Sequence, residues 1–165
     1  MNADERQAAF QNFVAKWTHP EYPAQVPKDA ELQDVEKTFA VQLPAAYRSF
    51  LLEHGAVSPG VSLLNSIVTN ELDIADLSAL CEPQEVIDDT TGWRESGLPV
   101  ELFAIGSDCS GNLFCFRQDD CQKPTEDAPI YLWDHDFDET EKVADSFTDW
   151  ILAFNGIELV EELEE

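Results

Sequence analysis

Basic residues are scarce in this sequence. Only nine of the 165 residues are lysine or arginine, against 34 aspartates and glutamates, which gives a formal net charge of −25. This excess of negative charge repels the phosphates of nucleic acids and the headgroups of anionic membranes. We therefore expect neither to be a direct partner. The same field would steer a positively charged protein surface toward the chain.

The sequence also lacks long apolar runs. No stretch approaches the roughly eighteen consecutive apolar residues that a membrane-spanning helix needs. Residues 1–13 contain no basic residue followed by a long apolar block, which a secretory signal would require. We therefore expect a cytoplasmic protein.

Recognisable motifs for metal binding or catalysis are missing as well. The cysteines are too far apart for a CxxC pair, and no histidine lies near enough in sequence to complete a zinc pattern: Cys81, Cys109, Cys115 and Cys121. We expect them to be buried or half-buried free thiols. The sequence contains no GxSxG, no HExxH and no P-loop. These absences predict a protein that is not an enzyme.

The apolar content is high enough for a packed core. At 165 residues the chain is the size of one ordinary domain, and 44% of it is hydrophobic. We expect a single domain over residues 1–165. Its acidic C-terminal tail, residues 157–165, alternates apolar and acidic residues, and the pattern leaves open whether it docks as a strand or a helical turn, or frays.

Apolar periodicity predicts three helices in the first third of the chain. Asn2 and Glu5 resemble a capping box that begins the first helix, and Asp29 is positioned to cap the second. A third helix opens at Pro44 and stops at Gly55. Their inward faces are Phe10, Phe13, Val14 and Trp17; Leu32, Val35 and Phe39; and Tyr47, Phe50, Leu51 and His54.

The pattern changes in the C-terminal half. A helix is indicated around residues 83–96, and short β-prone runs follow at 102–105, 113–116 and 130–133. These runs predict an antiparallel meander, with a tight reversal at 106–112 in which Asp108 and Asn112 cap backbone N–H groups. Ser146 begins a last helix, which ends at Gly156. The sheet and helices together predict an α+β fold.

Three local motifs, in this order, resemble the SUKH superfamily, the fold of Smi/Knr-type regulators and of many bacterial immunity proteins. LPAAYRSFLLEHG at residues 43–55 resembles LPxxYxxFLxxxNG, with His54 in place of asparagine. Residues 103–116 resemble the hairpin pattern (I/F)AxGxDxxGNxxxF, and PIYLWDHD at 129–136 resembles VYxWDHE. The resemblance spans about residues 29–154.

Several expectations follow from this resemblance. It implies one antiparallel sheet of about four to six strands flanked by helices, and no cofactor. It also implies an immunity protein, which binds a toxin delivered between competing bacteria and blocks it. Many such toxins are nucleases, whose basic substrate grooves suit an acidic partner. The net charge of this chain fits such a partner.

Eight acidic residues are the candidate contacts for a basic toxin, because they cluster in expected loops or strand ends: Asp88, Asp89, Asp119, Asp120, Asp134, Asp136, Asp138 and Glu139. If residues 134–138 stay extended, the three aspartates among them point the same way and can gather round a cation. An EF-hand loop is excluded, because Glu139 stands where glycine is required. We interpret the cluster as an acidic edge for a partner.

Three alternatives remain open at this stage. The same fold could serve as a regulatory scaffold that binds a host protein, since one fold hosts several functions. A small metal-dependent hydrolase could be built on the acidic strand end at residues 134–139. The carboxylates could also imitate a row of phosphates and so mimic nucleic acid. His135 is expected at the sheet edge, and His54 is expected to be packed and hydrogen-bonded near a helix C-terminus, where a cation is favoured.

Overall fold

The chain folds as three helices, then two helices with a short strand between them, then a four-stranded meander and a final helix. A computed structural model describes residues 1–160, and this part of the chain contains six α-helices, one 3-10 helix and one five-stranded antiparallel sheet. The predicted α+β class is confirmed. None of the described helices is both long enough and apolar enough to span a membrane.

The N-terminal helices form largely as their sequence signals predict. Helix α1 (Ala3–Trp17) begins with the Asn2–Glu5 capping box. Helix α2 spans Asp29–Phe39, but Lys28 is its N-cap, because Glu31 accepts a hydrogen bond from the Lys28 N–H. The predicted capping role of Asp29 is therefore wrong. Its carboxylate instead lies 2.8 Å from a guanidinium nitrogen of Arg48.

Helix α3 (Ala45–His54) ends where Gly55 adopts a φ of 76°, a left-handed backbone conformation that favours glycine. A Cβ at Gly55 would also lie 2.6 Å from the Gln25 carbonyl oxygen. His54 packs against Phe50, as expected, with 5.2 Å between the ring centroids. The expected hydrogen bonding of His54 is incomplete, because its buried Nε2 has no partner among residues 1–160.

The middle of the chain, which the sequence defines least clearly, contains α4 (Val61–Thr69), β1 (Ala79–Leu80) and α5 (Pro83–Arg94). The predicted helix around residues 83–96 is thus confirmed. Helix α5 lies along the outer edge of β2, where the Thr90 hydroxyl accepts a hydrogen bond from the Ala104 N–H at 2.8 Å. This contact satisfies a strand N–H that β1 is too short to reach.

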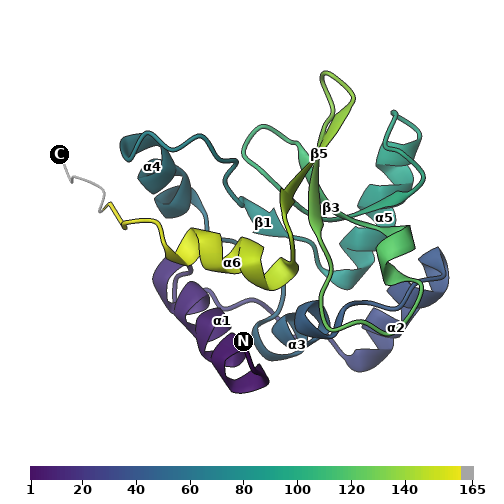
Figure 1. Cartoon of the computed structure of the whole chain (residues 1–165), viewed down its shortest axis with the longest axis horizontal. Coiled ribbons are helices and arrows are strands. Elements are labelled where there is room, and N and C mark those ends of the chain that lie inside the picture. The colour runs from purple at the N-terminus through teal and green to yellow at the C-terminus, as the bar shows by residue number, and fades with distance from the viewer. Residues whose placement is uncertain (161–165) are drawn as a thin grey trace.

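The sheet has the strand order β1-β2-β3-β4-β5, with every neighbouring pair antiparallel. Strands β2 (Leu102–Ser107), β3 (Leu113–Arg117) and β4 (Ile130–Asp134) are the predicted meander. Strand β5 (Glu139–Ala144) extends it as an edge strand with mostly exposed side chains. The 3-10 helix η1 (Gln118–Cys121) follows β3. Figure 1 shows the β4–β5 hairpin projecting away from α1, α3 and α6.

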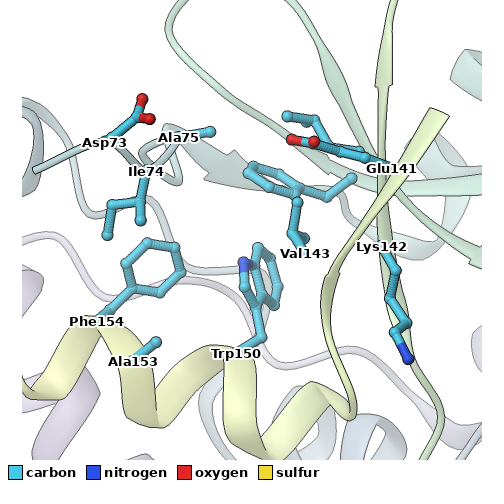
Figure 2. A pocket seen from close by; sticks show the side chains of 11 residues that line it. Asp73, Ile74, Ala75, Glu141, Lys142, Val143, Trp150, Ala153 and Phe154 are labelled. Atoms are coloured by element: carbon cyan, nitrogen blue, oxygen red, sulfur yellow. The ribbon is translucent and has the colours of Figure 1, made fainter. Parts of the chain in front are cut away.

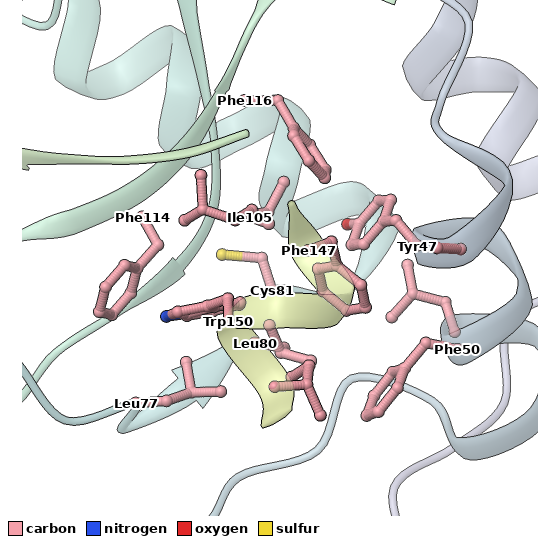
Figure 3. Close-up of a cluster of buried hydrophobic side chains, with 14 of the residues drawn as sticks. Tyr47, Phe50, Leu77, Leu80, Cys81, Ile105, Phe114, Phe116, Phe147 and Trp150 are labelled. Carbon is pink, nitrogen blue, oxygen red and sulfur yellow. The ribbon is translucent and has the colours of Figure 1, made fainter. Parts of the chain in front are cut away.

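The larger core lies between the sheet and helices α1, α3 and α6 (Phe147–Asn155). Tyr47, Phe116 and Phe147 meet here, with Tyr47 5.2 Å from Phe116 and 5.5 Å from Phe147 between ring centroids (Figure 3). A smaller cluster covers the other sheet face, where Trp93 packs edge-on against Trp133 at 5.8 Å. Each face of the central strands is therefore buried.

The cysteines are free thiols, as predicted, but not all are buried. Burial raises the pKa of the Cys121 thiol to about 12, with a smaller effect from Asp120, and burial also raises the pKa values of Cys81 and Cys115. Cys109 is exposed, contrary to the expectation, because it occupies the turn between β2 and β3. The three buried thiols are therefore protonated core side chains.

The acidic tail is described only as far as Val160. Ile157 is 5% exposed and belongs to the larger core. The Glu158 carbonyl accepts a hydrogen bond from the Asn70 side chain, and the Val160 N–H donates to the Ser66 hydroxyl. The first part of the tail therefore docks against α4. Residues 161–165, the rest of the predicted tail, lie outside the described residues.

Candidate functional site

The eight predicted contact acids occupy three separate places. Four of them lie in the turn between β4 and β5, which we call the hairpin tip, residues 134–139. Asp88 and Asp89 lie in α5, and Asp119 and Asp120 in η1. Strand β3 begins opposite Trp133, close to the hairpin tip, and η1 follows the other end of that strand. The structure therefore does not join all eight acids into one patch.

Two of the predicted acids face inward. Asp89 is half-buried, and its carboxylate lies 3.7 Å from the Cys81 thiol, which donates to it. Burial raises the pKa of Asp89, with the Cys81 hydrogen bond acting in the opposite direction. Asp120 is also half-buried, and its Oδ2 is enclosed without a hydrogen-bond partner among residues 1–160. Asp88 and Asp119 are exposed.

The hairpin tip is a tight turn held by its own aspartates. The Asp134 carboxylate accepts hydrogen bonds from the N–H groups of Asp136 and Phe137, at 2.9 and 3.2 Å. Asp138 has a φ of 50°, and its carboxylate accepts the indole N–H of Trp133 at 2.9 Å. The condition for three aligned aspartates, an extended segment at residues 134–138, is not met, because these local hydrogen bonds favour a reversal.

His135 fastens the hairpin tip to the turn between β2 and β3. Its Nδ1 lies 2.9 Å from the Asn112 side-chain oxygen, and its ring lies 5.4 Å from that of Trp93. The prediction that His135 is a sheet-edge residue is therefore wrong. Asp108 accepts the N–H groups of Ser110 and Asn112, both at 2.9 Å, so its predicted capping role is confirmed. The second and third sequence motifs thus meet in one hydrogen-bonded unit.

Phe137 is the exposed apolar residue of the hairpin tip. Its side chain is 75% exposed, although it is flanked in sequence by Asp136 and Asp138. A rigid aromatic side chain on an ordered turn binds with little loss of conformational entropy, and its burial by a partner gains hydrophobic free energy. The hairpin tip therefore combines carboxylates with an aromatic anchor, the composition of a protein-binding surface.

One face of the hairpin is hollowed. A hollow of about 370 Å³ is lined by Leu132, Asp134, Glu139, Thr140 and Glu141. The strand register pairs Leu132 with Glu141 and Asp134 with Glu139, so these four side chains project from the same face. Three of the four are carboxylates. A cationic group that entered the hollow would meet negative charge from both strands.

The hairpin tip also contains the metal-like group of side chains. Ligand atoms of Asp134, His135 and Asp136 all lie within 4.8 Å of one another. However, Asp134 already accepts two backbone N–H groups, and His135 Nδ1 is engaged by Asn112. The geometry of the turn accounts for these contacts. We therefore interpret this group as part of the turn architecture and not as a catalytic centre.

Sequence reasoning found the acids of the hairpin tip but missed Phe137. It named Asn112 only as a local backbone cap, and this role is wrong, because the Asn112 side chain contacts Asp108 and His135 instead. The contact of His135 with Trp93 joins a third segment, which only the arrangement in space reveals. The sequence did contain a signal for Phe137, because a single apolar residue within a run of acidic residues does not fit the alternation of apolar and polar residues in a strand. No comparable sequence signal indicated that β5 forms one side of the hollow.

The structure is thus a small α+β domain whose most prominent exposed feature is an acidic hairpin. Residues 27–153 match the model of the SMI1 / KNR4 family (SUKH-1), and this chain belongs to that family. The match includes all three motifs. The predicted resemblance is therefore confirmed.

A solved structure supports the same fold. A crystal structure of a protein from Pseudomonas syringae pv. tomato is similar over 92% of this chain and 97% of that protein, with a TM-score of 0.52 and 16% sequence identity. At this identity the likeness concerns the fold alone. No functionally curated protein matched the sequence.

Proposed function

We propose that this chain is an immunity protein that acts in the cytoplasm, without a cofactor and without catalysis, by binding and neutralising a cognate bacterial toxin. The toxin is a basic, nuclease-type protein, and the chain blocks its active groove. Membership of the SMI1 / KNR4 family supports the class of function. The observation that carries the proposal is the exposed Phe137 on a hydrogen-bonded tip rich in carboxylates.

The roles of the tip residues differ. Asp134 and Asp138 shape the turn through hydrogen bonds to Phe137 and Trp133, so their carboxylates are partly occupied. Asp136 and Glu139 are exposed and are the tip acids most available to a partner. Among the described residues, the one ion-pair contact of Asp136 is His135 at 3.4 Å. In this arrangement Phe137 supplies affinity, and the free carboxylates supply steering and orientation.

The test starts from the genes beside the one for this chain and uses any toxin domain that they encode. Co-expression of the two should preserve growth that the toxin alone abolishes. Phe137→Ala should weaken binding of the purified toxin about 30-fold, because an aromatic anchor contributes about 2 kcal/mol. The double charge reversal Asp136→Lys with Glu139→Lys should slow association about tenfold or more at low salt. Calorimetry and stopped-flow fluorescence measure these two quantities.

Charge reversal at the other two acidic places provides the matched controls. Asp88→Lys with Asp119→Lys alters net charge by the same amount but lies in α5 and η1. This pair should slow association less than the tip pair does. Equal effects of the two pairs would overturn the tip as contact surface. If no toxin is encoded nearby and the purified chain captures only a housekeeping protein, the regulatory-scaffold alternative replaces the immunity function.

A further inference from the structure

A second hollow opens beside the first, between the β4–β5 pair, α6 and the segment before β1. We call it the α6 cleft; its volume is about 320 Å³. It shares Leu132 and Glu141 with the hollow near the hairpin tip. Its remaining lining comes from the segments shown in Figure 2: Asp73, Ile74, Ala75, Phe114, Lys142, Val143, Trp150, Ala153 and Phe154.

The floor of the α6 cleft is aromatic. Phe114, Trp150 and Phe154 form a continuous row, with ring centroids 4.8 Å apart for Phe114 and Trp150 and 5.6 Å apart for Trp150 and Phe154, and each ring is at most 4% exposed. The walls are apolar but open to solvent: Ile74 is 46% exposed and Val143 is 37% exposed. The walls therefore offer most of the apolar surface, which gains free energy when the aliphatic stem of a cationic side chain covers it.

Carboxylates stand on opposite sides of this aromatic floor. Glu141 comes from β5 and Asp73 from the segment before β1, and Figure 2 shows them toward opposite ends of the ring row. Within residues 1–160 neither forms an ion pair with a lysine, arginine or histidine. The cleft therefore presents unneutralised negative charge at its rim.

The one basic residue of the lining does not neutralise them. Lys142 Nζ lies 2.9 Å from the Asp145 carboxylate, and Figure 2 shows its side chain directed away from the aromatic rings. This orientation follows from strand alternation, because Lys142 pairs with Tyr131 and Glu141 pairs with Leu132 on the opposite face. The field inside the cleft is thus set by Glu141 and Asp73.

We infer that the α6 cleft receives an arginine side chain of the protein partner. The inference rests on the proposed function and specifies the chemistry of the partner surface. A guanidinium forms paired hydrogen bonds with a carboxylate, while its three-carbon stem packs on apolar walls. A volume of about 320 Å³ is at the lower limit of small-molecule pockets, roughly 300–1,000 Å³, and suits one inserted side chain.

The two hollows then act together along one face of the hairpin. The hollow at Asp134, Glu139 and Glu141 leads into the α6 cleft through the shared Glu141. A basic segment that lies along β5 would place one arginine in the α6 cleft and further cations toward the hairpin tip. The cleft therefore contributes specificity that net charge alone does not provide.

The experiment is an NMR titration of the whole chain with blocked arginine, N-acetyl-arginine N-methylamide, at low salt. The Trp150 indole N–H signal, assigned with Trp150→Phe, should shift saturably in the millimolar range. Blocked citrulline, which is nearly isosteric but uncharged, should bind at least tenfold more weakly. Blocked lysine should bind several-fold more weakly, because its ammonium cannot form the paired hydrogen bonds of a planar guanidinium with a carboxylate. Arginine and citrulline shifts of equal size and midpoint would overturn the assignment.

Variants separate the cleft from general electrostatic attraction. Glu141→Gln should weaken blocked arginine about three- to tenfold, whereas Asp34→Asn, which removes the same charge from an exposed site on α2, should leave the midpoint unchanged. Ala153→Arg should fill the cleft from the chain itself and abolish the shift; Ala153 is exposed on α6, so the helix tolerates the change. Equal effects of Glu141→Gln and Asp34→Asn would contradict a built site.

The titration with blocked arginine tests the α6 cleft whether or not a toxin is the partner. Binding of blocked arginine at Trp150 together with failure of neutralisation would support the cleft and reject the immunity function. Conversely, full neutralisation by Ala153→Arg would reject the cleft as a partner contact and leave the proposed function standing. The titration and the neutralisation assay are separate measurements, so failure of one does not hide the result of the other.

Discussion

At the scale of single residues, His54 illustrates how burial changes a local preference. A histidine at a helix C-terminus is normally favoured as a cation. Here the imidazole packs against Phe50, and burial lowers the pKa of His54 more than the neighbouring Glu53 raises it. Its buried Nε2 lacks a partner within residues 1–160. His54 therefore favours the neutral form in the folded chain.

This lowered pKa predicts a stability loss in weak acid. A folded-state pKa below the unfolded value of about 6.5 means that the unfolded chain takes up the proton first, so stability falls as pH decreases through about 6.5 and levels off below the folded pKa. His54→Asn, the residue of the family pattern, should remove this loss. In urea unfolding, the free energy of unfolding of the native chain should be lower at pH 5.5 than at pH 7.5. The difference should be below about 1 kcal/mol, because the ring is partly solvated. An equal loss in both proteins would contradict the prediction.

At the scale of secondary-structure elements, the position of α6 depends on a carboxylate from outside the helix. Asp127, just before β4, accepts the Phe147 N–H at 2.8 Å, the Thr148 N–H at 3.2 Å and the Thr148 hydroxyl at 2.5 Å. Ser146 provides the local N-cap by accepting the Asp149 N–H at 3.0 Å, as its sequence signal predicts. Helix α6 is therefore tied to the start of β4, and this tie holds Trp150 under the cleft.

Removing the Asp127 carboxylate should loosen this connection. Asp127→Ala leaves the Thr148 N–H and hydroxyl without their acceptor, whereas the Phe147 N–H keeps the Ala128 carbonyl at 3.0 Å; the change should lower the free energy of unfolding by about 2 kcal/mol. Asp127→Asn keeps one acceptor oxygen and should cost roughly half as much. Denaturant unfolding measures the difference, and the Trp150 indole signal should move more in the alanine variant. Equal costs for the two variants would show that the acceptor oxygens do not anchor α6.

At the scale of the whole molecule, negative charge is a distributed property. Exposed carboxylates occur on α1, α2, α5, β5 and the hairpin tip, and several of the few cations are already paired, for example Arg48 with Asp29 and Glu36. The net charge of −25 therefore provides long-range attraction, while the hairpin tip and the α6 cleft provide the specific contacts.

This division predicts a characteristic salt response. Raising sodium chloride from about 20 mM to about 500 mM should slow toxin association by about ten- to a hundredfold, because screening shortens the field. The dissociation rate of the native complex should change much less, since Phe137 contributes through hydrophobic burial. Stopped-flow measurements across the salt series test both rates. An association rate that hardly changes between low and physiological salt would argue against electrostatic capture.

Much of the fold could be predicted from the sequence because its signals are local. In helices with an apolar stripe and a cap, such as α1 and α6, a few neighbouring residues indicate both the buried face and the first residue of the helix. The three central strands are short β-prone runs because both of their faces are buried. The acids at residues 134–139 were visible for the same reason, as a dense local run.

The sequence by itself therefore determined the class of fold, the order of its main elements and the sign of the electrostatic field around the protein. The tertiary structure alone decided the rest. Strand β5 has no apolar alternation, since it is an edge strand that pairs with β4 through its backbone and leaves its side chains in solvent. The α6 cleft joins Asp73 to Glu141 and Trp150, which lie far from it along the chain. Contacts between such distant residues depend on how the sheet and helices pack, and no local pattern encodes them.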